Sequence, residues 1–145
     1  MMEEMKALVR QKDICVLATA SQNKPHCSLM AYTTDDECRE IYMVTNKLTK
    51  KYRNLTENPL VSLLIDTRDE DTGSGQLKAK ALTVEGAFEG IEDEARKDVI
   101  RNRLLERHPH LGTLALHPDA EVFSIKVLSF LLLRGPTDSH LEQVV

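Results

Sequence analysis

The chain has 145 residues, of which 41% are hydrophobic and 29% charged, and its formal net charge is −4. A chain of this length and composition is typical of a single folded domain, residues 1–145, that buries a core without disulfides or a metal. The acidic balance excludes a general basic surface for nucleic acid. The longest apolar run near the end of the chain, Phe130 to Leu133, is far too short to span a membrane.

The start of the chain and its cysteines favour a cytoplasmic protein. The first residues, Met-Met-Glu-Glu-Met-Lys, are acidic and amphipathic, whereas an export signal is basic and then continuously apolar. Cys15, Cys27 and Cys38 lie too far apart in sequence to resemble a CxxC metal or redox pair. We therefore expect reduced thiols and no metal site.

The first third of the chain predicts one helix and three strands. Apolar residues recur at helical spacing over 3–11. Strand-like segments follow over 13–20, 26–34 and 40–45, separated by short polar turns. Because these turns are too short for crossover helices, the strands are expected to pair in antiparallel fashion.

A helix, a strand, a loop and a longer strand are predicted next. The helix covers 50–57 and ends at Asn58-Pro59, because proline disfavours helical geometry in the residue before it. An apolar strand follows over 60–66. Residues 67–76 lack apolar side chains and predict an exposed loop, after which alternation resumes over 77–90.

The remaining pattern completes an antiparallel β-barrel. Gly86 is expected to mark a bulge or a close approach within its strand. A helix is predicted over 92–107, then a loop to about residue 119, then residues 121–134 as two strands or one bent strand. The polar tail from Pro136 is expected to fray. The sum is about six strands and three helices, which favours a mainly β barrel with helices packed outside it.

The most informative segment is Thr45-Asn46-Lys47-Leu48-Thr49-Lys50-Lys51, where a predicted strand turns into a predicted helix. The first backbone N–H groups of a helix lack internal partners and carry partial positive charge. Hydroxyl groups and lysines beside them form a site that suits a phosphate. The alternative is that Thr49 only caps the helix while the lysines are solvated.

This segment, followed by Asn58-Pro59, resembles the Thr-Asn-x-x-Ser-Arg-Lys and Asn-Pro pattern of pyridoxamine 5′-phosphate oxidases. Residues 14–20 with Pro25-His26 resemble the opening strand and turn of that superfamily, and residues 84–87 resemble its later Val-x-Gly-x-Ala strand. The order and separation of these pieces agree over essentially the whole chain. The sequence thus resembles the FMN-binding split-barrel family.

The resemblance implies an antiparallel six-stranded split β-barrel with flanking helices, which forms a homodimer with FMN at the subunit interface. It also implies a set of cofactor-binding residues. The second strand would hold the flavin ring, the end of the third strand would lie near the ribityl phosphate, and the start of the helix would hold the phosphate. In that order, these residues are Cys27, Ser28, Leu29 and Met30; Thr45 and Asn46; and Thr49, Lys50 and Lys51.

Two functions stay open at this point, beside a purely structural interpretation in which the barrel dimer has only a vestigial pocket. The first is an FMN-dependent oxidoreductase that acts on an unidentified small-molecule substrate or electron donor, with no catalytic residue identified because the cofactor supplies the reactivity. The second is a protein that binds or senses flavin, haem or a deazaflavin without turnover. Ser28 stands where the vitamin oxidases have an arginine, and Arg134 leads to Gly135-Pro136 without the nearby histidine of their Arg-x-His pair. Both departures favour the second.

The histidines at 108, 110 and 117 are interpreted as solvated loop residues. No carboxylate or cysteine stands at a convincing ligand spacing from them, so they do not predict a metal site.

Overall fold

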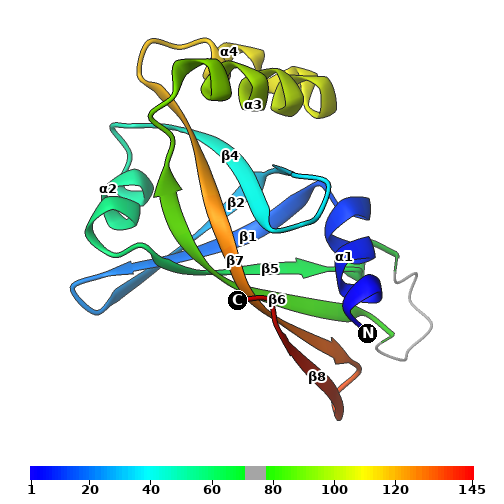
Figure 1. Cartoon of the computed structure of the whole chain (residues 1–145). Helices are drawn as coiled ribbons and strands as arrows, with labels where there is room; N and C mark the ends of the chain where they lie inside the picture. Colours follow the sequence, from blue (N-terminus) through cyan, green and yellow to red (C-terminus); the bar gives the residue numbers. More distant parts are fainter. Residues whose placement is uncertain (71–77) are drawn as a thin grey trace.

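The computed structural model describes residues 1–70 and 78–145. Its centre is an eight-stranded antiparallel sheet in the order β2-β1-β5-β6-β7-β4-β3, with β8 also paired to β7, and the sheet curls into a half-barrel (Figure 1). The strands are β1 (Ile14–Ser21), β2 (Lys24–Ala31), β3 (Thr33–Thr34), β4 (Glu40–Asn46), β5 (Leu60–Asp66), β6 (Lys80–Gly90), β7 (Ala120–Arg134) and β8 (Asp138–Gln143).

Helices cover the half-barrel at several places (Figure 1). They are α1 (Met2–Gln11), α2 (Lys50–Glu57), α3 (Glu94–Arg107) and the short α4 (Gly112–Ala115), with 3₁₀ turns over Arg68–Glu70 and Pro109–Leu111. The predicted fold class, a mainly β antiparallel split barrel with flanking helices, is confirmed. The loop predicted between residue 108 and about residue 119 is corrected, because it contains α4. The predicted loop over 67–76 is described only as far as residue 70.

The strand count is corrected from six to eight. The second predicted strand, 26–34, divides at Tyr32, whose hydroxyl donates a hydrogen bond to the Val9 carbonyl at 2.7 Å. This break is required because β2 pairs with β1 at one end of the sheet, whereas β3 pairs with β4 at the other end.

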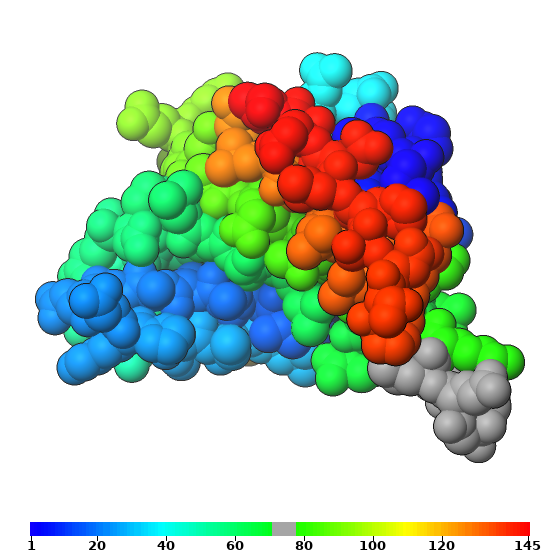
Figure 2. All heavy atoms as spheres, turned by 90° about the horizontal axis from the view of Figure 1, so that it is seen from below, coloured from blue at the N-terminus to red at the C-terminus, as the bar shows by residue number. Residues whose placement is uncertain are grey.

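The expectation that the tail frays was wrong. Gly135, with a positive φ of 68°, supports the tight turn that leads into β8. β8 then pairs with Ser129–Arg134 along its length, and its atoms lie against those of β7 in Figure 2. The polar sequence of the tail predicted a loop. An edge strand, however, is held by backbone hydrogen bonds and needs apolar side chains on one face only.

Residues 121–134 form one bent strand rather than two. β7 pairs with β4 through Lys126 and with β8 from Ser129, and the register against β6 shifts between these two stretches. Leu128 has no partner on β6, so it is the extra residue of a bulge. Opposite this bend lies Gly86, which confirms the sequence interpretation of that glycine as the mark of a bulge and a close approach.

Two apolar clusters hold the helices on the sheet. The larger one fills the half-barrel and includes Met5 and Val9 of α1 and Leu55 of α2. The smaller one joins Ile100 and Leu104 of α3 to β4 and β7. Within the described ranges, no helix is long and apolar enough to cross a membrane.

Replacing Gly86 by alanine should destabilise the protein. A Cβ atom there would lie 2.5 Å from Cγ2 of Ile125 and 3.0 Å from the Lys126 carbonyl oxygen, so the bend would have to open. Overpacking of this kind costs about 1–3 kcal/mol of unfolding free energy, measurable by urea denaturation. Gly90→Ala is the control, because a Cβ there meets nothing within 4 Å. Equal effects of the two substitutions would contradict the account of the bend.

Candidate functional site

The turn between β4 and α2 is fixed by its own side chains. The Thr49 hydroxyl accepts a hydrogen bond from the Tyr52 backbone N–H at 3.2 Å and donates one to the Asn46 carbonyl at 2.9 Å. The Asn46 side-chain oxygen accepts from the Leu48 N–H at 2.8 Å. Thr49 is therefore a helix cap, and its hydroxyl is already committed within the turn.

The first backbone N–H groups of α2 point out of this turn without partners. Within the described part of the chain, the N–H groups of Lys50 and Lys51 have no hydrogen-bond acceptor. Such groups carry the positive end of the helix dipole. The start of α2 therefore presents two adjacent donors in a field that favours an anion.

Lys51 adds an ammonium group that is only weakly compensated. Its Nζ lies 3.0 Å from the sulfur of Met30, a weak acceptor, and no carboxylate of the described residues forms an ion pair with it. Lys51 is half-buried, and this burial lowers the pKa of its amino group. Lys50, in contrast, is exposed. A partly desolvated cation without an anionic partner is costly, and a bound anion would remove that cost.

α2 is held firmly against the half-barrel. The Asn54 amide donates to the Thr19 hydroxyl of β1 at 3.2 Å, and both side chains are buried. The Tyr52 ring packs edge-on against Phe88 of β6 at a centroid distance of 6.0 Å. These contacts fix the direction in which the start of α2 points. Sequence reasoning missed Thr19 and Asn54, although an asparagine inside a short helix is a signal for a specific hydrogen bond.

β2 forms one end of the sheet and leaves a free backbone edge. The Tyr32 N–H donates a hydrogen bond to the Asp13 carbonyl at 3.0 Å. Along an antiparallel pair, residues that bond to the neighbouring strand alternate with residues whose backbone groups point away from it, so this bond shows which residues of β2 belong to each set. By this alternation, Cys27, Leu29 and Ala31 turn their backbone N–H and C=O groups toward the free edge. That edge offers donors and acceptors to a planar ring.

The predicted site residues divide between two faces of the sheet. Ser28 and Met30 face the side of the buried Cys15 and Leu17, whereas the side chains of Cys27 and Leu29 are exposed on the opposite face. Met30 meets Lys51, so the second strand and the start of α2 do come together.

The other two predicted residues end β4. Thr45 is buried opposite Glu121, and Asn46 lies opposite Ala120 and anchors the turn. Both therefore lie next to the start of α2 in the fold, as the sequence pattern predicts. Asn46 shapes the turn through its hydrogen bonds, whereas Thr45 is a buried residue of the strand that leads into it.

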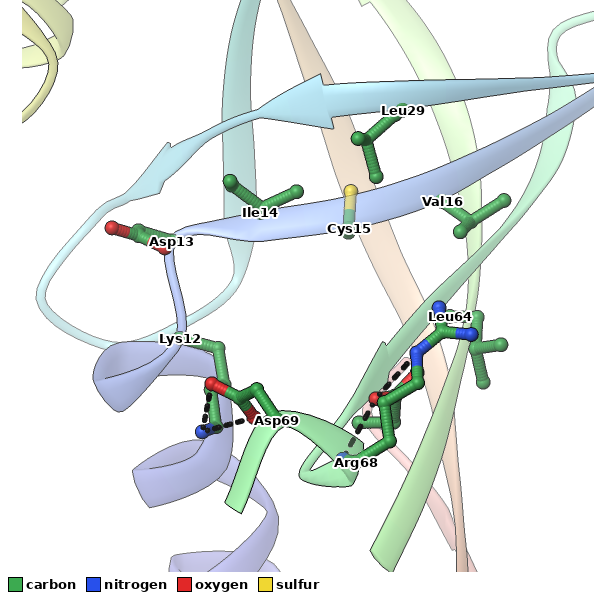
Figure 3. Close-up of a pocket in the computed structure, with 10 residues that line it drawn as sticks. Lys12, Asp13, Ile14, Cys15, Val16, Leu29, Leu64, Arg68 and Asp69 are labelled. Atoms are coloured by element: carbon green, nitrogen blue, oxygen red, sulfur yellow. Dashed lines mark hydrogen bonds and ion pairs between the residues drawn. The ribbon is translucent and has the colours of Figure 1, made fainter. Parts of the chain in front are cut away.

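A hollow of about 250 Å³ lies on the outer face of the sheet, near the end of α1 (Figure 3). Ile14, Val16, Leu29 and Leu64 supply its apolar lining. Both of its cations pair with carboxylates: Lys12 with Asp69 at 3.0 Å, and Arg68 with Asp66 at 3.2 Å. The hollow therefore has no uncompensated cation and differs in kind from the start of α2.

The interpretation of His108 as solvated is corrected. Its ring is buried, and Nε2 lies 2.8 Å from the Tyr32 carbonyl oxygen, so His108 ties the end of α3 to the segment between β2 and β3. His110 and His117 are exposed. Among the described residues, no group of three or more histidine, cysteine or acidic side chains is arranged to hold a metal.

Comparison with known proteins identifies the family. The family model of pyridoxamine 5′-phosphate oxidase matches residues 1–133. The chain belongs to the pyridoxamine 5′-phosphate oxidase family. A search of curated proteins found no match.

Solved structures share the fold of this family member at low identity. A haem-binding protein from Mycobacterium smegmatis superposes with a TM-score of 0.84 and 18% identity over 98% of this chain, which spans 57% of that protein. A putative pyridoxamine 5′-phosphate oxidase from Listeria innocua superposes with a TM-score of 0.70 and 20% identity, over 91% of this chain and 97% of that protein. An FAD-binding protein from Mesorhizobium loti superposes with a TM-score of 0.70 and 20% identity, over 90% of this chain and 91% of that protein.

Replacing Lys51 by methionine should stabilise the ligand-free protein, because it removes a partly desolvated cation. Burial lowers the folded-state pKa of Lys51 below its ordinary value of 10.5, so the penalty is complete near neutral pH and disappears as the pH rises through the folded pKa toward 10.5. The gain in unfolding free energy should therefore shrink in alkaline buffer.

Urea denaturation across this pH range measures that gain. The exposed Lys50→Met is the matched control and should leave stability nearly unchanged. Destabilisation by Lys51→Met would mean that its ammonium group already has a favourable partner in the folded protein.

Proposed function

We propose that this protein binds FMN and acts as an FMN-dependent oxidoreductase on a small molecule. The observation that carries the proposal is the half-buried ammonium group of Lys51. Among the described residues it contacts only the Met30 sulfur, and the two helix N–H groups beside it have no acceptor. A phosphate dianion supplies what this arrangement lacks. Membership of the pyridoxamine 5′-phosphate oxidase family and similarity to an FAD-binding protein support a flavin as the owner of that phosphate.

The residues of this chain would divide the work of holding FMN. Lys51, Lys50 and the first N–H groups of α2 would bind the phosphate, while Asn46 and Thr49 keep the turn in shape. Thr45 would lie near the ribityl-phosphate end. The free edge of β2 from Cys27 to Ala31 would offer backbone hydrogen bonds to the ring. When bound, the flavin supplies hydride and electron transfer, so the chain needs only to orient it and limit its contact with water.

The second half of the site would come from another copy of the chain in a homodimer. One row of side chains across the outer face of the sheet contains five apolar residues and a threonine. The residues at its two ends are exposed, Leu29 to 73% and Leu141 to 61% of its surface. In order across the sheet, the row is Leu29, Val16, Leu64, Thr83, Leu131 and Leu141. An apolar face of this kind is typical of a subunit interface.

A second candidate is binding of flavin, haem or a deazaflavin without turnover. The similarity to a haem-binding protein favours it, as does the small neutral Ser28 on β2. The absorption spectrum of the purified protein, with mass spectrometry of the released ligand, separates these candidates. Flavin bands that bleach with NADH or NADPH and return with an electron acceptor support the oxidoreductase. A Soret band, or flavin that is never reduced by any donor tried, contradicts it.

Replacing both Lys50 and Lys51 by alanine should weaken FMN binding by about 2–4 kcal/mol, the value of two charge-assisted contacts. Riboflavin lacks the phosphate, so its affinity should change little. Isothermal titration with both ligands measures the difference, and Lys24→Ala with Lys126→Ala is the control pair, since both lysines are exposed and lie outside the Thr45–Lys51 segment. If both ligands lose affinity equally, the phosphate is held elsewhere.

Placing two lysines on the outer face should break the homodimer. Leu60 and Leu141 both lie on that face and are exposed, so Leu60→Lys with Leu141→Lys introduces unpaired charge there without disturbing the core. Analytical ultracentrifugation should show a dimer for the unmodified chain and a monomer for this variant. Val99→Lys with Leu116→Lys is the control pair on α3 and the α4 end. A monomeric unmodified chain would contradict the proposal.

A further inference from the structure

A cationic hollow lies between α1, β3 and α3, away from the start of α2. Its volume is about 340 Å³, and three arginines contribute to its wall. The lining residues are Arg10, Thr33, Thr34, Asp35, Asp36, Arg103 and Arg107. None of them belongs to the proposed flavin site.

Arg107 is fixed in this wall by neutral groups. Its Nη2 donates to the carbonyl oxygen of Arg10 at 2.8 Å and also to that of Lys12, and its guanidinium carbon lies 5.5 Å from the centre of the Tyr32 ring. These contacts cap the end of α1 and orient the guanidinium. None of them neutralises its charge.

Arg10 faces the same hollow from α1. Its Nη2 donates to the Asp36 carbonyl oxygen at 3.0 Å, which is again a neutral acceptor. Arg103, one turn before Arg107 on α3, forms the one ion pair in the wall, with Asp36 at 3.1 Å. The Asp36 side chain is 92% exposed, so a better anion can displace it from Arg103 into water.

The other carboxylate of the wall, Asp35, accepts hydrogen bonds within the turn that follows it. Asp35 Oδ1 accepts the backbone N–H groups of Arg39 and Glu40 at 2.8 and 2.9 Å. It therefore stabilises the turn between β3 and β4. The hollow is left with two guanidinium groups, those of Arg10 and Arg107, that have no anionic partner among the described residues.

We propose that this hollow binds the phosphoryl group of a small molecule, either inorganic phosphate or a phosphate monoester. Guanidinium groups match phosphate oxygens with paired N–H donors, and those of Arg10 and Arg107 form no ion pair with a carboxylate of the described residues. The volume falls at the lower end of small-ligand pockets, about 300–1,000 Å³, which suits a compact ligand rather than a macromolecular partner. The ligand would join α1 to α3, at a site separate from the flavin.

The test is an amide NMR titration of the full-length protein with inorganic phosphate and with phenyl phosphate, at constant ionic strength. Saturable shifts are expected at Thr33, Thr34 and Asp36. Arg10→Gln with Arg103→Gln should lower the affinity by about tenfold or more, because two charged donors are lost while the capping residue Arg107 is kept. Tighter binding of phenyl phosphate than of phosphate would identify a monoester as the ligand class, and equal binding would identify phosphate itself.

Matched controls separate this site from general charge and from the flavin site. Arg68→Gln with Arg101→Gln removes the same charge from arginines outside the hollow, each paired with its own aspartate, and should not change the affinity. The Lys50→Ala and Lys51→Ala pair should also still bind phosphate in the hollow. Unsaturable shifts, shifts confined to the start of α2, or equal affinity in the Arg10 and Arg103 variant would each overturn the proposal, whatever the result with FMN.

Discussion

The proposed site depends on the ammonium group of Lys51, which is half-buried and has no anionic partner among the described residues. Its contact with the Met30 sulfur satisfies one donor weakly, and the helix dipole of α2 adds positive potential at the same place. A folded protein gains nothing from such an arrangement by itself, since burial makes the charge more costly. The arrangement becomes favourable when a dianion is bound, which is why we infer a phosphate there.

The fold holds this charge in place through contacts distant from it. The Asn54 to Thr19 hydrogen bond and the packing of Tyr52 on Phe88 tie α2 to β1 and β6. The bend of β7 at Leu128 allows one strand to pair first with β4 and then with β8, which curls the sheet around the core that α2 covers. The direction in which the start of α2 points is thus set by contacts with the core and with two strands.

The sequence predicted those helices, strands and turns whose positions depend on neighbouring residues in the chain. The boundaries of α2, β4 and β5 follow from the Thr49 cap, from alternation and from Asn58-Pro59, and Gly86 was predicted correctly because only a glycine fits beside Ile125. β8 was missed because its pairing is made by backbone groups. The break at Tyr32 was missed because it reflects which neighbour each half of the segment finds across the sheet.

The same distinction applies to the sites. The Thr45 to Lys51 segment pointed to the start of α2, yet only the fold shows that Lys51 is half-buried whereas Lys50 is exposed. His108 is buried against the segment between β2 and β3, and Arg10 converges with Arg107 where α1 packs near α3; a single sequence carries no signal for either contact. Tertiary contacts of this kind are set by distant partners rather than by neighbours in the chain.

The most direct measurement is an amide NMR titration with FMN and riboflavin that follows the backbone N–H groups of Lys50 and Lys51. These two groups have no acceptor in the described chain, so a phosphate that docks there must shift both. We expect FMN to move their resonances strongly downfield and riboflavin to leave them nearly unchanged. If FMN binds while both resonances stay in place, the start of α2 is not the phosphate site.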